Sequence, residues 1–310
     1  MNGQKPADTV GRFAPSPTGP FHIGLLTAAL GSYVAARAAG GRWLLRIEDI
    51  DTLRAVPGSE SAILRGLEVH GLDWDGTPLR QSERTEAYAA ALQRLAERGL
   101  LFDCACSRRE IAAIAHAGSE GPIYPGTCRS GLPAGKPARA RRVRVTDVPI
   151  AFEDGVQGHF QQDLARQVGD FVLYRADGVW AYQLAVVVDD IHQQVTQVAR
   201  GRDLLTSTPR QIYLHHLLGH RAPDYLHLPL ITDAAGLKVS KQTGAAPLDP
   251  RRAGANLTKV LRFLGQQLPP DLHGAPPPEQ LAWATAHWQV ARVPRQGGFV
   301  EPSGAHGGQE

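Results

Sequence analysis

The segment from Arg12 to Leu25 (RFAPSPTGPFHIGL) combines residue types that could bind a phosphate. The apolar run 9–14 predicts a short strand, prolines and glycines predict a tight loop, and apolar residues recur at helical spacing over 23–37. This order aims unpaired backbone N–H groups and the positive end of a helix dipole at one point. His22 stands at the helix entrance as a side-chain donor. The alternative is an ordinary turn with a capping histidine.

All the cysteines of the chain, Cys104, Cys106 and Cys128, fall within 25 residues. A Cys-x-Cys pair and a third cysteine suit a tetrahedral zinc site that lacks one ligand, because soft thiolates favour zinc over magnesium or calcium. His116, Tyr124 or water could complete it, and on general grounds an imidazole is a better ligand than a phenol. Three unrelated thiols are the alternative. We predict a structural zinc site that holds a loop-rich insert together.

Three further polar residues accompany predicted buried strands. Glu48 follows the strand 42–47 and Arg200 follows the strand 195–199, so both should lie where open α/β sheets bind ligands. An arginine in this place suits bidentate recognition of a carboxylate. Tyr182 lies in the run 180–188, which we predict to be a buried strand after a hairpin. Taken alone, each residue is equally compatible with an ordinary, non-functional place on the surface or in the core.

A possible triphosphate-binding loop follows the last predicted buried strand, 226–231. Its sequence is Lys238-Val239-Ser240-Lys241-Gln242. Two lysines three residues apart can neutralise the charge that builds on a triphosphate in a transition state. By itself a pentapeptide of this kind is a weak signal, since exposed loops are often basic.

Together these segments resemble the two signatures of class I aminoacyl-tRNA synthetases, in the glutamyl/glutaminyl branch. The first signature usually ends in His-Ile-Gly-His and here reads His22-Ile23-Gly24-Leu25, which leaves His22 as its only imidazole. The second, usually Lys-Met-Ser-Lys-Ser, follows in the expected order about 215 residues later and ends in Gln242. Leu-Asp-Trp-Asp at 72–75 and Gln-Ser-Glu-Arg at 81–84 are also similar to glutamyl synthetases. The resemblance spans roughly residues 9–265.

The resemblance implies a role for each matching residue. It implies that glutamate is held by Arg12, Ser16, Glu48, Tyr182 and Arg200. It implies that ATP, with Mg²⁺, is bound by Pro15, His22, Gly24, Lys238, Ser240 and Lys241. His22 and Lys241 would be the catalytic residues, because they steady the triphosphate. Small members of the branch carry Cys-x-Cys and Tyr-x-x-x-Cys, which favours Tyr124 over His116 as the fourth zinc ligand.

A truncated group within this branch glutamylates a modified base, and the shortness of this chain after Lys241 favours that group. The resemblance then implies tRNA-independent activation of L-glutamate with ATP to glutamyl-adenylate. It also implies transfer of the glutamyl group to queuosine in the anticodon of tRNA(Asp). One alternative is a truncated ordinary glutamyl-tRNA synthetase that charges the 3′ end of tRNA(Glu). The other is a binding module that kept the fold and lost the chemistry.

The implied fold is a doubly wound parallel α/β sheet, a Rossmann-like core. We expect residues 1–103 and 146–248 to form its two halves, with the zinc-binding insert at 104–145. A short helical segment at 249–292 and a disordered tail at 293–310 should follow, without an anticodon-binding domain. Helical spacing also predicts helices at 59–71, 85–98, 206–218, 256–264 and 279–288.

The composition is that of a globular protein, with 43% hydrophobic and 20% charged residues among 310. No run of about 18 apolar residues occurs, so we expect no membrane association. We find no apolar signal core and expect a cytoplasmic monomer with reduced thiols. The net charge of +3 is compatible with an RNA partner without indicating one. The basic stretch 139–145 (RARRVRV) is either a solvated strand face or a contact for RNA phosphates.

Overall fold

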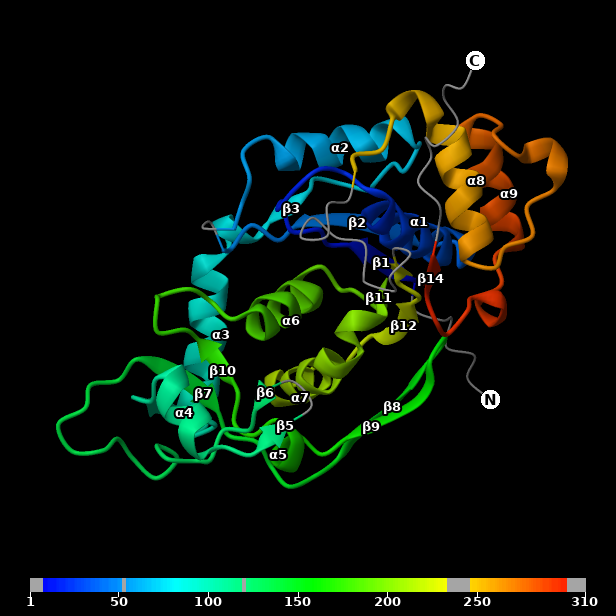
Figure 1. The fold of residues 1–310 in the computed structure, drawn as a ribbon. Coiled ribbons are helices and arrows are strands. Elements are labelled where there is room, and N and C mark those ends of the chain that lie inside the picture. Colours follow the sequence, from blue (N-terminus) through cyan, green and yellow to red (C-terminus); the bar gives the residue numbers. More distant parts are fainter. Residues whose placement is uncertain (1–7, 52–53, 119–120, 233–245, 300–310) are drawn as a thin grey trace, which may run out of the picture.

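The computed structural model describes residues 8–51, 54–118, 121–232 and 246–299, and a parallel sheet forms its centre (Figure 1). One half of this sheet comprises β1 (Val10–Phe13), β2 (Arg42–Ile47) and β3 (Leu79–Arg80), which pair in parallel. The other half contains the parallel pair β11 (Gln197–Gly201) and β12 (Asp224–Leu228). β1 and β11 lie side by side, and the Thr196 backbone N–H donates to the Val10 carbonyl at 3.0 Å. The predicted Rossmann-like α/β core is therefore confirmed.

Helices cover both faces of the sheet. Side chains alternate between the two faces along each strand, so each strand contacts helices on both sides. Trp43 and Leu45 of β2 join the apolar core that lies beneath α1 (Ile23–Ala38), α8 (Ala253–Phe263) and α9 (Pro277–His287). Arg46 of β2 faces the other side, where it donates to Val186 and Asp190 of the helix α6 (Tyr182–His192). Gly31 allows α1 to approach β12 closely, since a Cβ atom there would lie 2.4 Å from the side chain of Leu228.

The segment that contains Tyr182 is a helix, which corrects the prediction of a buried strand over 180–188. α6 (Tyr182–His192) packs against α3 (Thr85–Glu97) and α7 (Thr208–Leu218). Residues 183–190 are all buried, so the helix is surrounded by protein on every side. The apolar run 184–188 (LAVVV) shows no helical periodicity, and its valines favour a strand locally. Tertiary packing decided the conformation here.

An antiparallel sheet supports the region that contains the cysteines. Its strands are β4 (Leu101–Cys104), β7 (Ala140–Val143) and β10 (Val172–Tyr174), with β7 in the middle. Two of these strands extend beyond the predicted limits 104–145, because the insert is closed by strands that flank it on both sides. The remaining elements before β11 are α2 (Ser59–Val69), α4 (Arg108–Ile114), β5 (Ala117–Gly118), β6 (Gly121–Pro122), β8 (Ile150–Asp154), β9 (Gly158–Gln162) and α5 (Leu164–Gln167).

Residues 293–299 are ordered, whereas the sequence predicted a disordered tail from 293 onward. β14 (Gly298–Phe299) pairs in parallel with β13 (Ile231–Thr232). The Arg295 carbonyl accepts hydrogen bonds from the side chains of Gln157 at 3.0 Å and Arg202 at 3.3 Å. A composition rich in glycine and proline cannot reveal such bonds to distant residues. Residues 300–310 lie outside the described part of the chain.

No helix in the described part of the chain is long and apolar enough to cross a membrane.

Candidate functional site

A cavity of about 1090 Å³ opens at the carboxyl ends of the central parallel strands. Residues that follow β1, β2 and β11 line it, together with the start of α6 and the loop after β12. Eight sequence-predicted site residues line this one cavity: Arg12, Pro15, Ser16, His22, Gly24, Glu48, Tyr182 and Arg200. The predicted residues Lys238, Ser240 and Lys241 lie outside the described residues.

His22 is the N-cap of α1. Its Nδ1 accepts hydrogen bonds from the backbone N–H groups of Gly24 at 3.1 Å and Leu25 at 3.4 Å. The neutral ring therefore carries its proton on Nε2. The sequence predicted unpaired N–H groups at this helix N-terminus, with a capping histidine as the alternative; in this structure the imidazole caps these two amides. The loop before the helix is tied down as well, because the Gly19 N–H donates to Ser59 Oγ at 2.9 Å.

A buried charge network holds Arg12 beneath the cavity. Its Nε donates to Asp190 of α6 at 3.3 Å, and Arg46 donates to the same carboxylate. Arg46 is fully buried and also donates to Gln193 Oε1 at 2.9 Å. Burial opposes ionisation of Asp190, but Arg46 and Arg12 outweigh it and lower the pKa of this carboxyl to about 2.

Neither Arg46 nor Asp190 was predicted from the sequence to have a function. Arg46 lies within a largely apolar strand, and Asp190 lies two residues beyond the predicted strand 180–188. The available signal was a second arginine, Arg46, near the end of the predicted buried strand RWLLRI, between Leu45 and Ile47. Such a residue requires a buried partner of opposite charge, because an unpaired charge in the core is too costly.

Glu48 follows β2 and is half-buried at the edge of the cavity. Burial raises the pKa of Glu48 to about 7, although Arg46 and Arg12 act in the opposite direction. Near neutral pH this carboxyl is thus poised between its two protonation states. A cation bound beside it would stabilise the ionised form.

Arg200 lies on β11 and is 5% exposed. Its Nη1 has no hydrogen-bond partner among the described residues, although its Nε and Nη2 are both hydrogen-bonded. Tyr182 begins α6 and lines the same cavity. Burial raises the pKa of Tyr182, so its hydroxyl stays neutral and can donate. Together with Arg12 and Glu48, these two side chains complement a ligand that carries carboxylate groups and an ammonium group.

The structure brings the three cysteines together. Their Sγ atoms lie within 4.8 Å of one another, and Cys106 and Cys128 are 3.6 Å apart. A tetrahedral zinc ion with Zn–S bonds of about 2.3 Å places its sulfur ligands about 3.8 Å apart, so the cluster is of the right size for a metal ion. The Tyr124 hydroxyl lies 3.5 Å from Cys104 Sγ and 3.9 Å from Cys106 Sγ. His116 is exposed, and its carbonyl accepts the Ile123 N–H at 2.9 Å. This geometry favours Tyr124 over His116.

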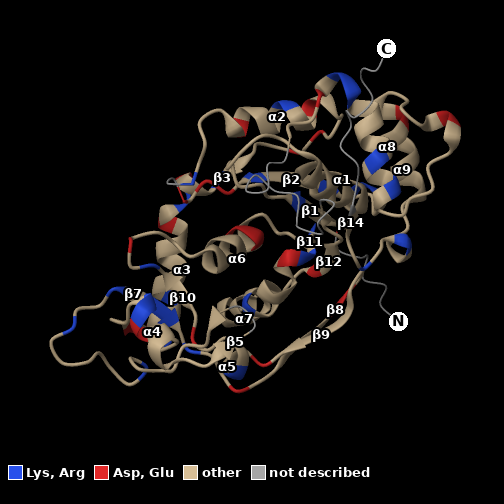
Figure 2. Cartoon of the chain, viewed as in Figure 1, with Lys and Arg blue, Asp and Glu red and all other residues tan. Residues whose placement is uncertain are grey.

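The basic stretch 139–145 serves mainly to pack the cysteine region. The Arg142 guanidinium lies 3.9 Å from the centre of the Tyr124 ring, and its Nε donates to Cys104 Sγ at 3.3 Å. Arg144 lies over Phe102, and Arg141 pairs with Asp103 at 3.2 Å. These contacts favour the structural interpretation over phosphate binding for the three arginines. Figure 2 shows further basic residues on and around α4.

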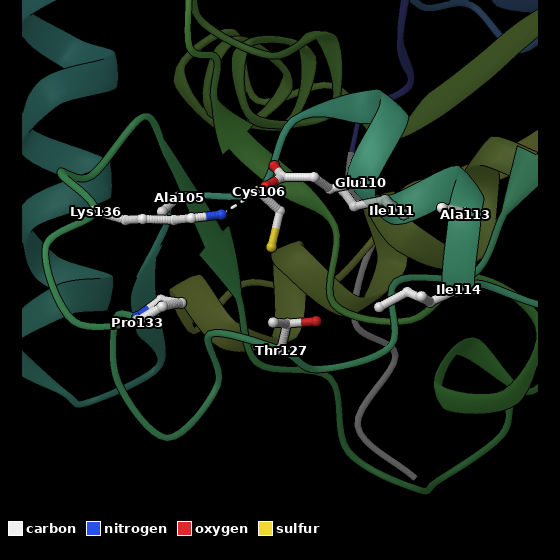
Figure 3. Close-up of a pocket in the computed structure, with 9 residues that line it drawn as sticks. All are labelled: Ala105, Cys106, Glu110, Ile111, Ala113, Ile114, Thr127, Pro133 and Lys136. Atoms are coloured by element: carbon white, nitrogen blue, oxygen red, sulfur yellow. Dashed lines mark hydrogen bonds and ion pairs between the residues drawn. The ribbon is translucent and has the colours of Figure 1, made fainter.

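A smaller cavity of about 350 Å³ adjoins Cys106 (Figure 3). Apolar side chains of α4 form one side of it, and the ion pair between Lys136 and Glu110, at 2.6 Å, lies at its edge. None of the predicted glutamate- or ATP-binding residues in the described part of the chain lines this cavity.

Comparison with known proteins identifies close relatives. The family model for the catalytic domain of class I tRNA synthetases (E and Q) matches residues 9–251. A protein from Thiobacillus denitrificans named glutamyl-Q tRNA(Asp) synthetase is 53% identical over 298 residues, which cover 96% of this chain and 99% of the relative. One of the same name from Dechloromonas aromatica is 55% identical over 295 residues, 94% of this chain and 98% of the relative. The crystal structure of a glutamate tRNA ligase from Elizabethkingia meningosepticum in complex with its amino acid has a TM-score of 0.79 at 27% identity, covering 95% of this chain and 67% of that one.

Proposed function

This chain belongs to the class I glutamyl- and glutaminyl-tRNA synthetase family, and we propose that it activates L-glutamate with ATP and then transfers the glutamyl group to queuosine in the anticodon of tRNA(Asp). The observation that carries the proposal is the cavity, in which the family-matched residues converge on a space suited to an amino acid with an acidic side chain. The names of the relatives supply the tRNA partner.

Glutamate binding follows from the charges around the cavity. The Nη1 of Arg200, which has no partner in the described part of the chain, provides a charge-assisted donor for the side-chain carboxylate. The Glu48 carboxylate accepts from the α-ammonium group, and Arg12 and Ser16 lie on the β1 side of the cavity towards the α-carboxylate. Tyr182 closes the space from the start of α6. Each charge of the amino acid thus meets a group of opposite charge.

Activation needs no covalent intermediate with the protein. The α-carboxylate oxygen of glutamate attacks the α-phosphate of ATP, the bond to the β-phosphate oxygen breaks, and pyrophosphate leaves. Positioning and charge stabilisation therefore dominate the catalysis. Pro15, His22 and Gly24 line the ATP side of the cavity, and His22 is assigned to the triphosphate. Lys238, Ser240 and Lys241 are assigned to ATP from the sequence alone, and Mg²⁺ accompanies the nucleotide.

We also propose a structural zinc ion held by Cys104, Cys106, Cys128 and Tyr124. The sulfur spacing and the phenol oxygen beside two thiols fit a tetrahedral ion. The Arg142 N–H that reaches Cys104 Sγ favours the thiolate form, which is the form that binds metal. The ion would join the end of β4 to the loop at 124–128, which contains no helix or strand of its own.

Two observations favour queuosine over the 3′ end of tRNA(Glu) as the acceptor. Identity to the proteins named glutamyl-Q tRNA(Asp) synthetase is 53–55% over nearly their whole length. Identity to the glutamate tRNA ligase is 27%, and this chain covers 67% of that protein. Both functions require a pocket for an amino acid with an acidic side chain, so an experiment must distinguish between the two acceptors.

The test is ATP–pyrophosphate exchange with glutamate and Mg²⁺, without and with tRNA. Exchange without tRNA is the expected result, and exchange that requires tRNA would favour the ordinary synthetase. Absence of exchange under both conditions would support a binding module. Labelled glutamate should then be transferred to tRNA(Asp) that carries queuosine. Matched tRNA(Asp) with guanosine at that position should stay unlabelled, and labelling of both would refute queuosine as the acceptor.

A further inference from the structure

Behind Arg200 lies a buried polar cluster that no sequence motif indicated. Its members are Asp154 at the end of β8, His227 on β12 and Thr208 at the start of α7. Asp154 is 4% exposed, and His227 and Thr208 are fully buried. Arg200 and His227 are direct partners in the parallel register of β11 and β12. The cluster is thus built by the central sheet immediately behind the cavity.

The hydrogen bonds of Asp154 fix the tautomer of His227. Its Oδ1 accepts from the backbone N–H groups of Val156 at 2.9 Å and Gln157 at 2.8 Å. Its Oδ2 lies 2.6 Å from His227 Nδ1, and burial lowers the pKa of His227, although Asp154 opposes this effect. The carboxylate can only accept, so Nδ1 carries the proton and Nε2 is left as an acceptor.

The orientation of Arg200 follows from this tautomer. Its Nε donates to His227 Nε2 at 3.2 Å, and its Nη2 donates to Thr208 Oγ1 at 2.8 Å. Two nitrogen atoms of the guanidinium therefore already donate hydrogen bonds, and Nη1 remains without a partner among the described residues. The imidazole is neutral, so it orients the guanidinium without cancelling its charge. A carboxylate in its place would compete with an acidic ligand.

We infer that Asp154, His227 and Thr208 form a positioning network that presents Arg200 to the side-chain carboxylate of glutamate and so determines selectivity for glutamate over glutamine. This inference rests on the proposed function of the cavity. Neither Asp154 nor His227 lines the cavity, so both act through Arg200 and are not catalytic residues.

The decisive substitution is Asp154→Asn. The amides of Val156 and Gln157 demand an acceptor at Oδ1, so the new NH₂ group must face His227 Nδ1. The imidazole then has to carry its proton on Nε2, where it meets the Arg200 Nε–H at 3.2 Å and competes with Arg200 Nη2 for Thr208 Oγ1, which lies 3.0 Å from Nε2. Two donors would oppose each other, and the guanidinium would leave its position. The side chain keeps its size, so the change is electronic and not steric.

We expect Asp154→Asn to raise the glutamate KM at least tenfold in pyrophosphate exchange, with the ATP KM changed less than twofold. The ratio of kcat/KM for glutamate to that for glutamine should fall at least tenfold. The ¹⁵N spectrum of labelled histidine should show the His227 proton moving from Nδ1 to Nε2, with the resonance assigned by its loss in His227→Gln. Asp170→Asn is the matched control. Asp170 is also a buried acceptor, for the Val145 N–H at 2.8 Å, but it lies outside the cavity, so its glutamate KM should not change.

A folded Asp154→Asn protein with unchanged glutamate KM and selectivity would overturn the network. Should that variant not fold, Thr208→Val decides the question. It removes the hydroxyl that accepts from Arg200 Nη2 at 2.8 Å and contacts His227 Nε2 at 3.0 Å, without changing the size of the side chain. It should raise the glutamate KM at least threefold, and an unchanged value would also overturn the inference. Wild-type protein without glutamate-dependent exchange would instead refute the proposed function and, with it, this role of the network.

Discussion

The raised pKa of Glu48 predicts how glutamate affinity depends on pH. Burial raises this pKa from 4.5 to about 7, against the opposing charges of Arg46 and Arg12. The ammonium group of glutamate requires the ionised carboxylate, so the apparent KM should scale with one plus the ratio of protonated to ionised Glu48. With a pKa of about 7, this factor is roughly 11 at pH 6 and roughly 1.1 at pH 8, which gives about a tenfold fall in KM.

The assay is the glutamate KM in pyrophosphate exchange from pH 6 to 8, with the ATP KM measured in parallel to remove effects of ATP protonation. The groups of free glutamate do not titrate in this range. Glu48→Gln should be independent of pH and weaker than the wild type at pH 8 by roughly 10- to 150-fold, from about 1.5–3 kcal/mol for a charge-assisted hydrogen bond. A flat wild-type KM, or an equal slope in Glu48→Gln, would refute the role assigned to this carboxylate.

The raised pKa of Glu48 has the opposite effect on the folding stability of the protein without glutamate. Because the folded state binds the Glu48 proton more tightly than the unfolded state does, this group favours folding below pH 4.5. That contribution is lost as the pH rises towards about 7. Glutamate should recover it, so the increase in melting temperature that glutamate causes should be larger at pH 8 than at pH 6.

Three further outcomes follow from the assigned roles. Arg200→Ala should raise the glutamate KM roughly 10- to 150-fold, from the loss of one charge-assisted bond, and leave the ATP KM unchanged in steady-state kinetics. Lys241→Ala should abolish adenylate formation while glutamate still binds in calorimetry; full exchange activity would remove the loop from the mechanism. Metal analysis should find one zinc per chain, and metal-free protein should melt at a lower temperature. Tyr124→Phe should weaken zinc retention against a chelator, and unchanged retention would leave water as the fourth ligand.

The described residues that line the cavity and were predicted to bind a ligand could be selected from the sequence, and most of the sheet was predictable as well. β2 lies where the run RWLLRI placed it, because a short apolar run between polar segments has few other solutions. Arg12, His22 and Arg200 could be selected because each lies in a predicted strand, in the loop that follows it or directly after it, and because their types match the resemblance. Their convergence on one cavity follows from the parallel order of β1, β2 and β11, in which the carboxyl ends meet at one edge.

The supporting residues could not be found in this way, for a physical reason. Asp154 and His227 stand 73 residues apart, and each is unremarkable in its own segment. Their function arises from the register that places His227 beside Arg200 and from the turn amides that fix the Asp154 carboxylate. Register depends on the packing of the whole sheet. The helical conformation of residues 182–192, where a strand was predicted, depends on tertiary packing in the same way. A functional arginine on a parallel strand therefore predicts a supporting acceptor at its register partner, and that position is the one to substitute first once the strand order is known.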